Sequence, residues 1–311
     1  MKYFFYIVIM SVILLSGCEQ LTSTRRFTED HYYVVTGKLY ENLPVTPERA
    51  IFIGKTIPAE GGNLMEMLIS DAAVQITDLQ SNVVYPLEFV NEINGNSLNI
   101  GYYDASETLV PQAQKQYRLE AVFYDNLTES IDSLWAVTTV PQPIEIEIDS
   151  LVFTADTTLT GWPELVYETA NLEHPLTIKA EDGSQQQLYF LFYCLENWQN
   201  ARYINPFADH DYPDDEEEYE DPTYGYPRKI EYFNLYMPEL DPEDGLYYII
   251  DRSYKGNFIF YGRYSVTIYN IDDNFYQYLY RPEGYNFGGI NNGIGYFGAV
   301  SGNTIFTRVI E

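Results

Sequence analysis

Short β-branched and aromatic runs recur along the first half of this chain, and their spacing constrains the fold more than any other feature. The runs are YYVVTGKLY (32–40), RAIFIGKTI (49–57), AAVQITD (72–78), VVYPLEF (83–89), QYRLEAVFY (116–124) and LWAVTTV (134–140). Turn-forming pairs such as Asn94-Gly95 and Asp125-Asn126 separate them, and no helical pattern lies between them. This spacing predicts an antiparallel β-sandwich of the immunoglobulin or fibronectin type over residues 32–141.

A second unit is predicted over residues 142–311. Pro141 and Pro143 mark the boundary, near residue 142. The isoleucines that follow alternate with acidic residues, which is typical of a strand with one face in water. These isoleucines are Ile144, Ile146 and Ile148.

The rest of this second unit is predicted to be mostly β and rich in aromatic residues. Its strand-like runs are QQQLYFLFYCL, RKIEYFNLYM, GLYYIIDRSY and GNFIFYGRYSVTIYNI, and the last is long enough for a central strand. One short helix is predicted at 273–281, with Asp272 or Asp273 as its N-cap. The fold class is therefore all-β with one short helix.

The N-terminus has the pattern of a bacterial lipoprotein signal peptide, residues 1–17. Lys2 precedes 13 apolar residues, fewer than the roughly 20 that a membrane-spanning helix needs. Leu-Ser-Gly-Cys at 15–18 is similar to a lipobox, so we expect cleavage before Cys18 and acylation of Cys18. Residues 18–31 would then be a lipidated cysteine and a polar tether. The acyl chains would hold the protein on a lipid bilayer of the cell envelope.

Cys194 is the only other cysteine, so a lipidated Cys18 leaves no intramolecular disulfide to form. It lies in the apolar run LYFLFYCLENW, which favours a buried structural thiol.

The net charge and the aromatic content of the chain limit the classes of ligand that it can bind. Asp and Glu number 46 against 17 Lys and Arg, for a formal net charge of -29, so nucleic acid is excluded as a ligand. The chain holds 31 tyrosines, many alternating with apolar residues, which favours an aromatic core with hydrated hydroxyls. An exposed aromatic platform for sugars or peptides is the alternative.

An acidic segment, DHDYPDDEEEYED (209–221), has nine carboxylates in 13 residues. Its oxygens are of the kind that bind Ca²⁺, but the spacing is not that of an EF-hand loop, and a solvated loop is the simpler interpretation. The candidate metal ligands are Asp209, Asp211, Asp214, Asp215 and Glu216.

A glycine-rich segment, GIGYFGAV (293–300), matches the G-x-G-x-x-G of dinucleotide-binding turns and the longer motif of kinase phosphate loops. Both motifs need a domain after them, and only 13 residues follow Gly298. We therefore predict no nucleotide or other cofactor, a turn and final strand at 299–311, and glycines that permit positive φ or close backbone approach. These glycines are Gly288, Gly289, Gly293, Gly295 and Gly298.

Patterns typical of enzymes are sparse. His31, His174 and His210 are scattered, and neither H-E-x-x-H nor G-x-S-x-G occurs. No nucleophile and base can be paired from the sequence, so we expect a protein without catalytic activity. A hydrolase built on paired carboxylates stays open as a less favoured alternative, because acidic residues are abundant.

Taken together, these segments resemble a lipoprotein family of Bacteroidota, catalogued as domain of unknown function 4249. The resemblance is carried by the lipobox, YYVVTGKLY, DAAVQITDLQSNVVYPLEF, QYRLEAVFYD, AVTTVPQPIEIEI, NFYQYL and NFGGINNGIGYFGAV. It covers nearly all of the chain after the signal peptide, and the acidic segment is an insertion relative to its pattern. It implies an outer-membrane location and association with TonB-dependent receptors, and it assigns no catalytic residues.

We therefore expect a lipid-anchored outer-membrane lipoprotein that is a non-catalytic partner of a TonB-dependent transporter. A free-standing surface module that binds glycans or peptides is the alternative.

Overall fold

The computed structural model describes residues 32–56, 67–94, 97–125, 129–156, 161–174, 176–179, 187–196, 202–204, 229–232, 247–250, 254–281 and 287–311. Strands dominate these residues, and sheets pack face to face. The all-β, sandwich-like prediction is confirmed. The immunoglobulin or fibronectin type stays a prediction.

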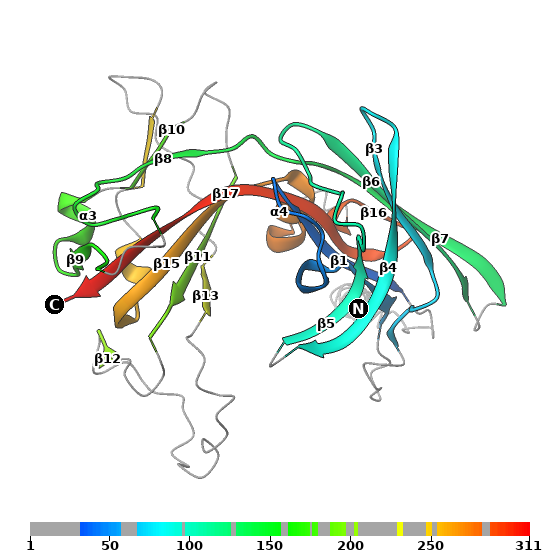
Figure 1. The fold of residues 1–311 in the computed structure, drawn as a ribbon, viewed down its shortest axis with the longest axis horizontal. Helices are drawn as coiled ribbons and strands as arrows, with labels where there is room; N and C mark the ends of the chain where they lie inside the picture. Colours follow the sequence, from blue (N-terminus) through cyan, green and yellow to red (C-terminus); the bar gives the residue numbers. More distant parts are fainter. Residues whose placement is uncertain are drawn as a thin grey trace, which may run out of the picture.

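A six-stranded sheet forms most of one lobe, on the right in Figure 1. In spatial order its strands are β16 (Ile290–Asn291), β7 (Ser130–Thr139), β6 (Gln116–Asp125), β3 (Ala73–Asp78), β4 (Val83–Asn94) and β5 (Ser97–Tyr103). The strands predicted at 72–78, 83–89, 116–124 and 134–140 are all present. Strand β5 was not predicted, because polar Asn99 and Gly101 interrupt its apolar pattern.

A larger sheet runs through both lobes. Its main order is β13 (Lys229–Tyr232), β11 (Leu188–Cys194), β15 (Phe260–Ile271), β17 (Ile294–Ile310), β1 (Tyr33–Tyr40) and β2 (Phe52–Lys55). Short strands β12 (Arg202–Tyr203) and β9 (Glu164–Val166) pair with β15 and β17. The pairs β1–β17 and β9–β17 are parallel, so the sandwich is not purely antiparallel as predicted.

A three-stranded sheet and short helices complete the described fold. The sheet has the order β14 (Tyr247–Ile250), β10 (Leu176–Lys179) and β8 (Glu145–Glu147). The helices are α3 (Ala170–Glu173), α4 (Asp273–Tyr280) and the 3₁₀ turns η1 (Pro47–Arg49), η5 (Lys255–Asn257) and η6 (Phe287–Gly289). Helix α4 confirms the helix predicted at 273–281, and the Asp272 carboxylate caps it by accepting the Phe275 N–H at 3.0 Å.

Strand β17 contributes to two hydrophobic cores. Phe297 packs with β1 against the six-stranded sheet, whereas Ile305 and Val309 pack against the three-stranded sheet and α3. All three side chains point to one face of β17, because side chains alternate along a strand. Figure 1 shows β17 running from one lobe to the other. The domain boundary near residue 142 stays a prediction, and β17 joins the parts on either side of it.

A third, aromatic cluster lies on the opposite face of β17. Tyr296 and Val300 contact Phe275 of α4 and Tyr189 of β11 there. Helix α4 therefore covers this face of the large sheet.

The end of the chain differs from the prediction. The turn expected within 299–311 is absent, and these residues continue β17, a single strand of 17 residues. Gly302, within this segment, pairs with Tyr269 of β15, and a Cβ there would lie 2.1 Å from the Ile268 carbonyl oxygen. Glycine here permits close strand approach and does not end the strand.

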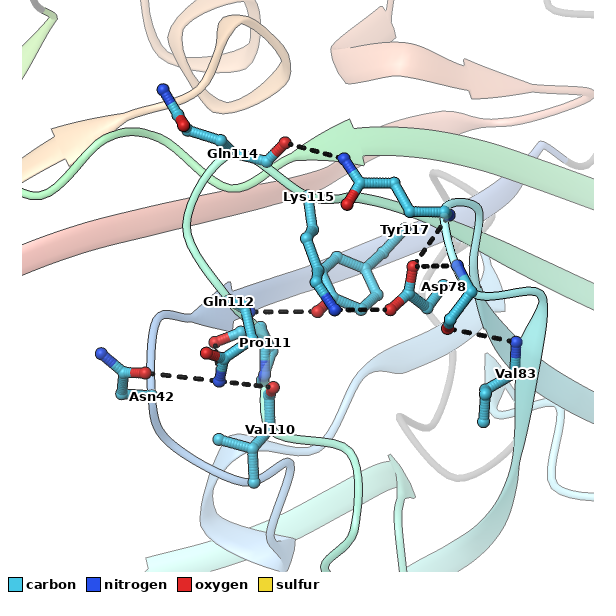
Figure 2. A network of polar contacts seen from close by, with 11 residues as sticks. Asn42, Asp78, Val83, Val110, Pro111, Gln112, Gln114, Lys115 and Tyr117 are labelled. Atoms are coloured by element: carbon cyan, nitrogen blue, oxygen red, sulfur yellow. Dashed lines mark hydrogen bonds and ion pairs between the residues drawn. The ribbon is translucent and has the colours of Figure 1, made fainter.

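A polar network closes one end of the six-stranded sheet (Figure 2). Asp78, which is buried, accepts hydrogen bonds from the backbone N–H groups of Gln80 and Ser81 at 2.9 and 3.1 Å. Its other oxygen pairs with Lys115 Nζ at 3.0 Å. These contacts tie the β3–β4 turn to the segment that leads into β6.

Candidate functional site

Several residues that the sequence singled out lie outside the described residues. They are Cys18, His31, His210 and the acidic segment 209–221, with its candidate ligands Asp209, Asp211, Asp214, Asp215 and Glu216. Their predictions stay predictions.

The glycine-rich segment lies within the described fold and is part of a strand. Gly295 and Gly298 belong to β17 and pair with Val35 and Lys38 of β1. Gly295 has φ +108°, and a Cβ there would lie 2.0 Å from the Val35 carbonyl oxygen. Gly288 and Gly289, just before it, also have positive φ. The predicted role in backbone conformation is confirmed, and the segment does not have the strand–turn–helix geometry of a dinucleotide motif.

The remaining histidine and cysteine do not come together. His174 Nδ1 lies 2.7 Å from Asp149 Oδ2, beside α3. The backbone N–H of Leu151, together with this contact, lowers the pKa of Asp149. Cys194 is buried, as predicted, and burial raises the pKa of its thiol.

Many tyrosines lie in the cores, as predicted, but the hydroxyls of Tyr102 and Tyr264 bond to the backbone and are not hydrated as we expected. Tyr102 donates to the Ile69 carbonyl at 2.7 Å, and Tyr264 donates to the Phe260 carbonyl at 3.0 Å. Burial raises the pKa of Tyr102 to about 12. These hydroxyls are fixed by backbone partners, so they are structural groups.

The outer side of the six-stranded sheet is exposed, and its side chains differ in composition from those of the buried cores. Strand pairing aligns four side chains across β4, β3, β6 and β7, which we call the Trp135 row. Gln75 pairs with Pro86 on one side and with Glu120 on the other, and Glu120 pairs with Trp135. The neighbouring inward residues, such as Ala121, Leu134 and Ala136, fill the core, so alternation places the Trp135 row on the solvent side.

Small side chains next to this row leave a hollow. Val122 pairs with Ala73 of β3 and with Ser133 of β7, so two small side chains flank Val122 in the row beside Glu120 and Trp135. The resulting depression, the Trp135 hollow, has a volume of about 610 Å³.

Hydrogen bonds join the polar side chains of the hollow to one another. Glu120 accepts at both carboxylate oxygens, from Arg118 Nη2 at 2.9 Å and from Gln75 Nε2 at 2.9 Å. The Arg118 guanidinium lies over the Trp135 ring, 4.8 Å from its centroid. Trp135 nevertheless keeps 38% of its surface exposed, and Val122 keeps 45%. The hollow therefore combines an accessible indole with an ordered amide, carboxylate and guanidinium.

Such a set is suited to holding a ligand by stacking and by planar hydrogen bonds. Sequence reasoning placed Trp135 only in a strand. The signal that identifies it is its position in SLWAVTT, where it alternates with buried Leu134 and Ala136 and so faces water.

Two further searches of the described residues are negative. No group of three or more His, Cys, Asp or Glu side chains is placed to hold a metal ion there. In the same ranges, no helix has the length and apolar character needed to cross a membrane.

Comparison with protein-family models, with curated proteins and with solved structures finds no match to this chain. The family resemblance stays a prediction.

Proposed function

We propose that this protein is a lipid-anchored, non-catalytic binding lipoprotein of the bacterial outer membrane, and that the Trp135 hollow is its ligand site. The observation that carries the proposal is the exposed indole of Trp135 beside the fixed side chains of Arg118, Glu120 and Gln75. Exposed apolar side chains, including Val122, Tyr124 and Ile131, also lie on this face, and apolar patches rimmed by polar residues are a common mark of binding sites.

The hydrogen bonds of Glu120 suit this side chain to ligand binding. Both of its oxygens already accept hydrogen bonds from Arg118 and Gln75. These contacts fix the orientation of the carboxylate, and each oxygen keeps a lone pair that can accept from a ligand hydroxyl group. Glu120 is therefore suited to orient its neighbours and the ligand.

We further propose that the protein acts beside a TonB-dependent transporter, to which it presents its ligand. The lipobox at 15–18 and the family resemblance support this role. A free-standing binding module would use the same hollow, so the two roles differ in the partner and not in the site.

Affinity purification from native membranes in mild detergent tests the role. We expect the wild-type protein and a Leu151→Ala control to recover an outer-membrane barrel, since Leu151 is exposed but lies outside the hollow. If no barrel is recovered with either protein, the transporter role is wrong and the free-standing module is favoured.

A further inference from the structure

We propose that the Trp135 hollow binds pyranose rings of a neutral oligosaccharide. This inference rests on the proposed function, because it takes the hollow as the ligand site. It follows from the side chains of the hollow, from the paired state of its backbone and from its charge.

The indole supplies a stacking surface. Trp135 lies at one end of the row, with Val122 and Ser133 beside it along the hollow. The C–H face of a pyranose ring is apolar and packs on an aromatic ring, as other apolar faces do. The Arg118 guanidinium lies over one face of the indole, so a sugar ring would pack on the part of the ring that Arg118 leaves exposed.

The polar side chains match neighbouring hydroxyl groups. Amide, carboxylate and guanidinium groups each present paired donors or acceptors in a plane, which suits two adjacent hydroxyls of a sugar ring. Gln75, Glu120 and Arg118 are already joined by hydrogen bonds, which fixes their orientation before the ligand arrives. Ala73 and Ser133 are small, so a ring can approach these groups over a low floor.

An added peptide strand is a poorer fit to this place. Such strands bind at a free sheet edge, where backbone N–H and C=O groups are unpaired. Here β3 lies between β4 and β6, and β6 lies between β3 and β7. At the level of the hollow β7 is also covered, because Trp135 pairs with Asn291 of β16. Recognition must therefore come from side chains alone.

The charge of the site favours a neutral ligand. Glu120 neutralises Arg118 across a 2.9 Å contact, so the hollow offers no free cation to an anionic group. The chain as a whole carries a formal charge of -29, which repels phosphates and acidic polymers. A polyhydroxylated, uncharged ligand needs no free cation and is not repelled by the negative charge of the chain.

Calorimetric titration of the full-length, lipidated protein tests the inference. The detergent must lack sugar headgroups, since these would compete for the hollow. The probes are soluble oligosaccharides of glucose, mannose, galactose, xylose and N-acetylglucosamine, and a mixed pool of decapeptides serves as the second arm. Thermal unfolding of each variant checks that it is folded.

We expect at least one oligosaccharide to bind, with Trp135→Ala raising its dissociation constant by at least about tenfold. Trp135→Phe should restore much of the affinity, and Leu151→Ala should leave it unchanged. If only the peptides bind, and Trp135→Ala removes that binding, the saccharide inference is wrong while the binding function stands. If neither arm shows binding that depends on Trp135, both the inference and the proposed site are wrong.

Discussion

At the scale of single residues, Asp272 has the most consequential environment in the described structure. It is 8% exposed, caps α4 through the Phe275 N–H, and accepts from the Thr138 hydroxyl of β7 at 2.6 Å. Next to it, the Asn274 amide donates to the Val137 and Phe297 carbonyls. The start of α4 thus links the two sheets of the sandwich through buried polar groups, where every lost partner is costly.

Asp272→Asn should change how stability depends on pH. Burial raises the pKa of Asp272 to about 6, against the hydrogen bonds that favour its charged form. Between about pH 4 and pH 6 the folded chain then binds more protons at this group than the unfolded chain, so the free energy of unfolding falls as pH rises. Asparagine can still cap α4 but cannot ionise. Between pH 4 and pH 7.5 we therefore expect the free energy of unfolding of the variant to fall by roughly 2–3 kcal/mol less than that of the wild type.

Urea unfolding at pH 4 and at pH 7.5 measures the effect, with Asp273→Asn as the matched control on an exposed neighbour. An Asp272→Asn variant with the wild-type decline between the two pH values would show that Asp272 is not the group responsible.

Gly295→Ala should destabilise the protein by about 3 kcal/mol or more. The residue has φ +108°, and the new Cβ would meet the Val35 carbonyl oxygen, a backbone atom that cannot move aside. Gly256→Ala is the control, because nothing lies within 4 Å of a Cβ there, and it should change stability by less than about 0.5 kcal/mol. Chemical denaturation distinguishes the two, and equal stabilities would contradict the close β1–β17 approach.

At the scale of elements, the turns at one end of the six-stranded sheet depend on Asp78 (Figure 2). Burial opposes its ionisation, but hydrogen bonds from Ser81, Lys115 and Gln80 outweigh burial and lower the pKa of Asp78 to about 2. Its charged form therefore stabilises the fold above about pH 4, and this contribution is lost as the pH falls toward 2. The contribution of Asp78 to stability therefore increases as the pH rises, whereas that of Asp272 decreases.

Asp78→Asn should lower the free energy of unfolding at pH 7 by about 1–3 kcal/mol, since Lys115 loses its partner. The difference from wild type should shrink as the pH is lowered from 4 to 2. Asp71→Asn, an exposed residue outside the network, is the control for the urea titrations. A deficit that persists unchanged at pH 2 would mean that the ion pair is not its cause.

Elements with a strong local pattern could be predicted from the sequence, and long-range pairings could not. Residues 116–121 alternate between polar and apolar, and Asp272 precedes an amphipathic segment, so β6 and α4 are where they were expected. The parallel pairing of β1 with β17 has no local signal, because neither strand specifies its partner. The Trp135 row was missed for the same reason: Gln75, Glu120 and Trp135 meet only once register brings three strands together.

At the scale of the whole molecule, the acidic body and the lipid anchor that we propose would have complementary roles. A net charge of -29 disfavours contact with an anionic membrane surface, so stable attachment needs acyl chains. Residues 18–31 would separate that attachment from the first strand, which begins at Tyr33.

Cys18→Ala should abolish incorporation of radiolabelled palmitate and move the protein from the membrane to the soluble fraction. Cys194→Ala is the matched control. Its thiol is buried in the core, so this variant can lose stability but should still be labelled. Labelling of the Cys18→Ala protein would place the acylation elsewhere.

The pairing of β1 with β17 also sets an order of events during synthesis. Val35 and Gly295 are register partners, so residues 260 positions apart must meet before the large sheet can close. Strand β1 is synthesised long before its partner β17. Until β17 is available, one edge of β1 is unpaired, and unpaired strand edges are prone to aggregation. Contacts of such long sequence separation also slow folding. We therefore expect that the chain needs protection from aggregation until β17 is available to pair, and that a chain truncated before β17 is a substrate for proteases.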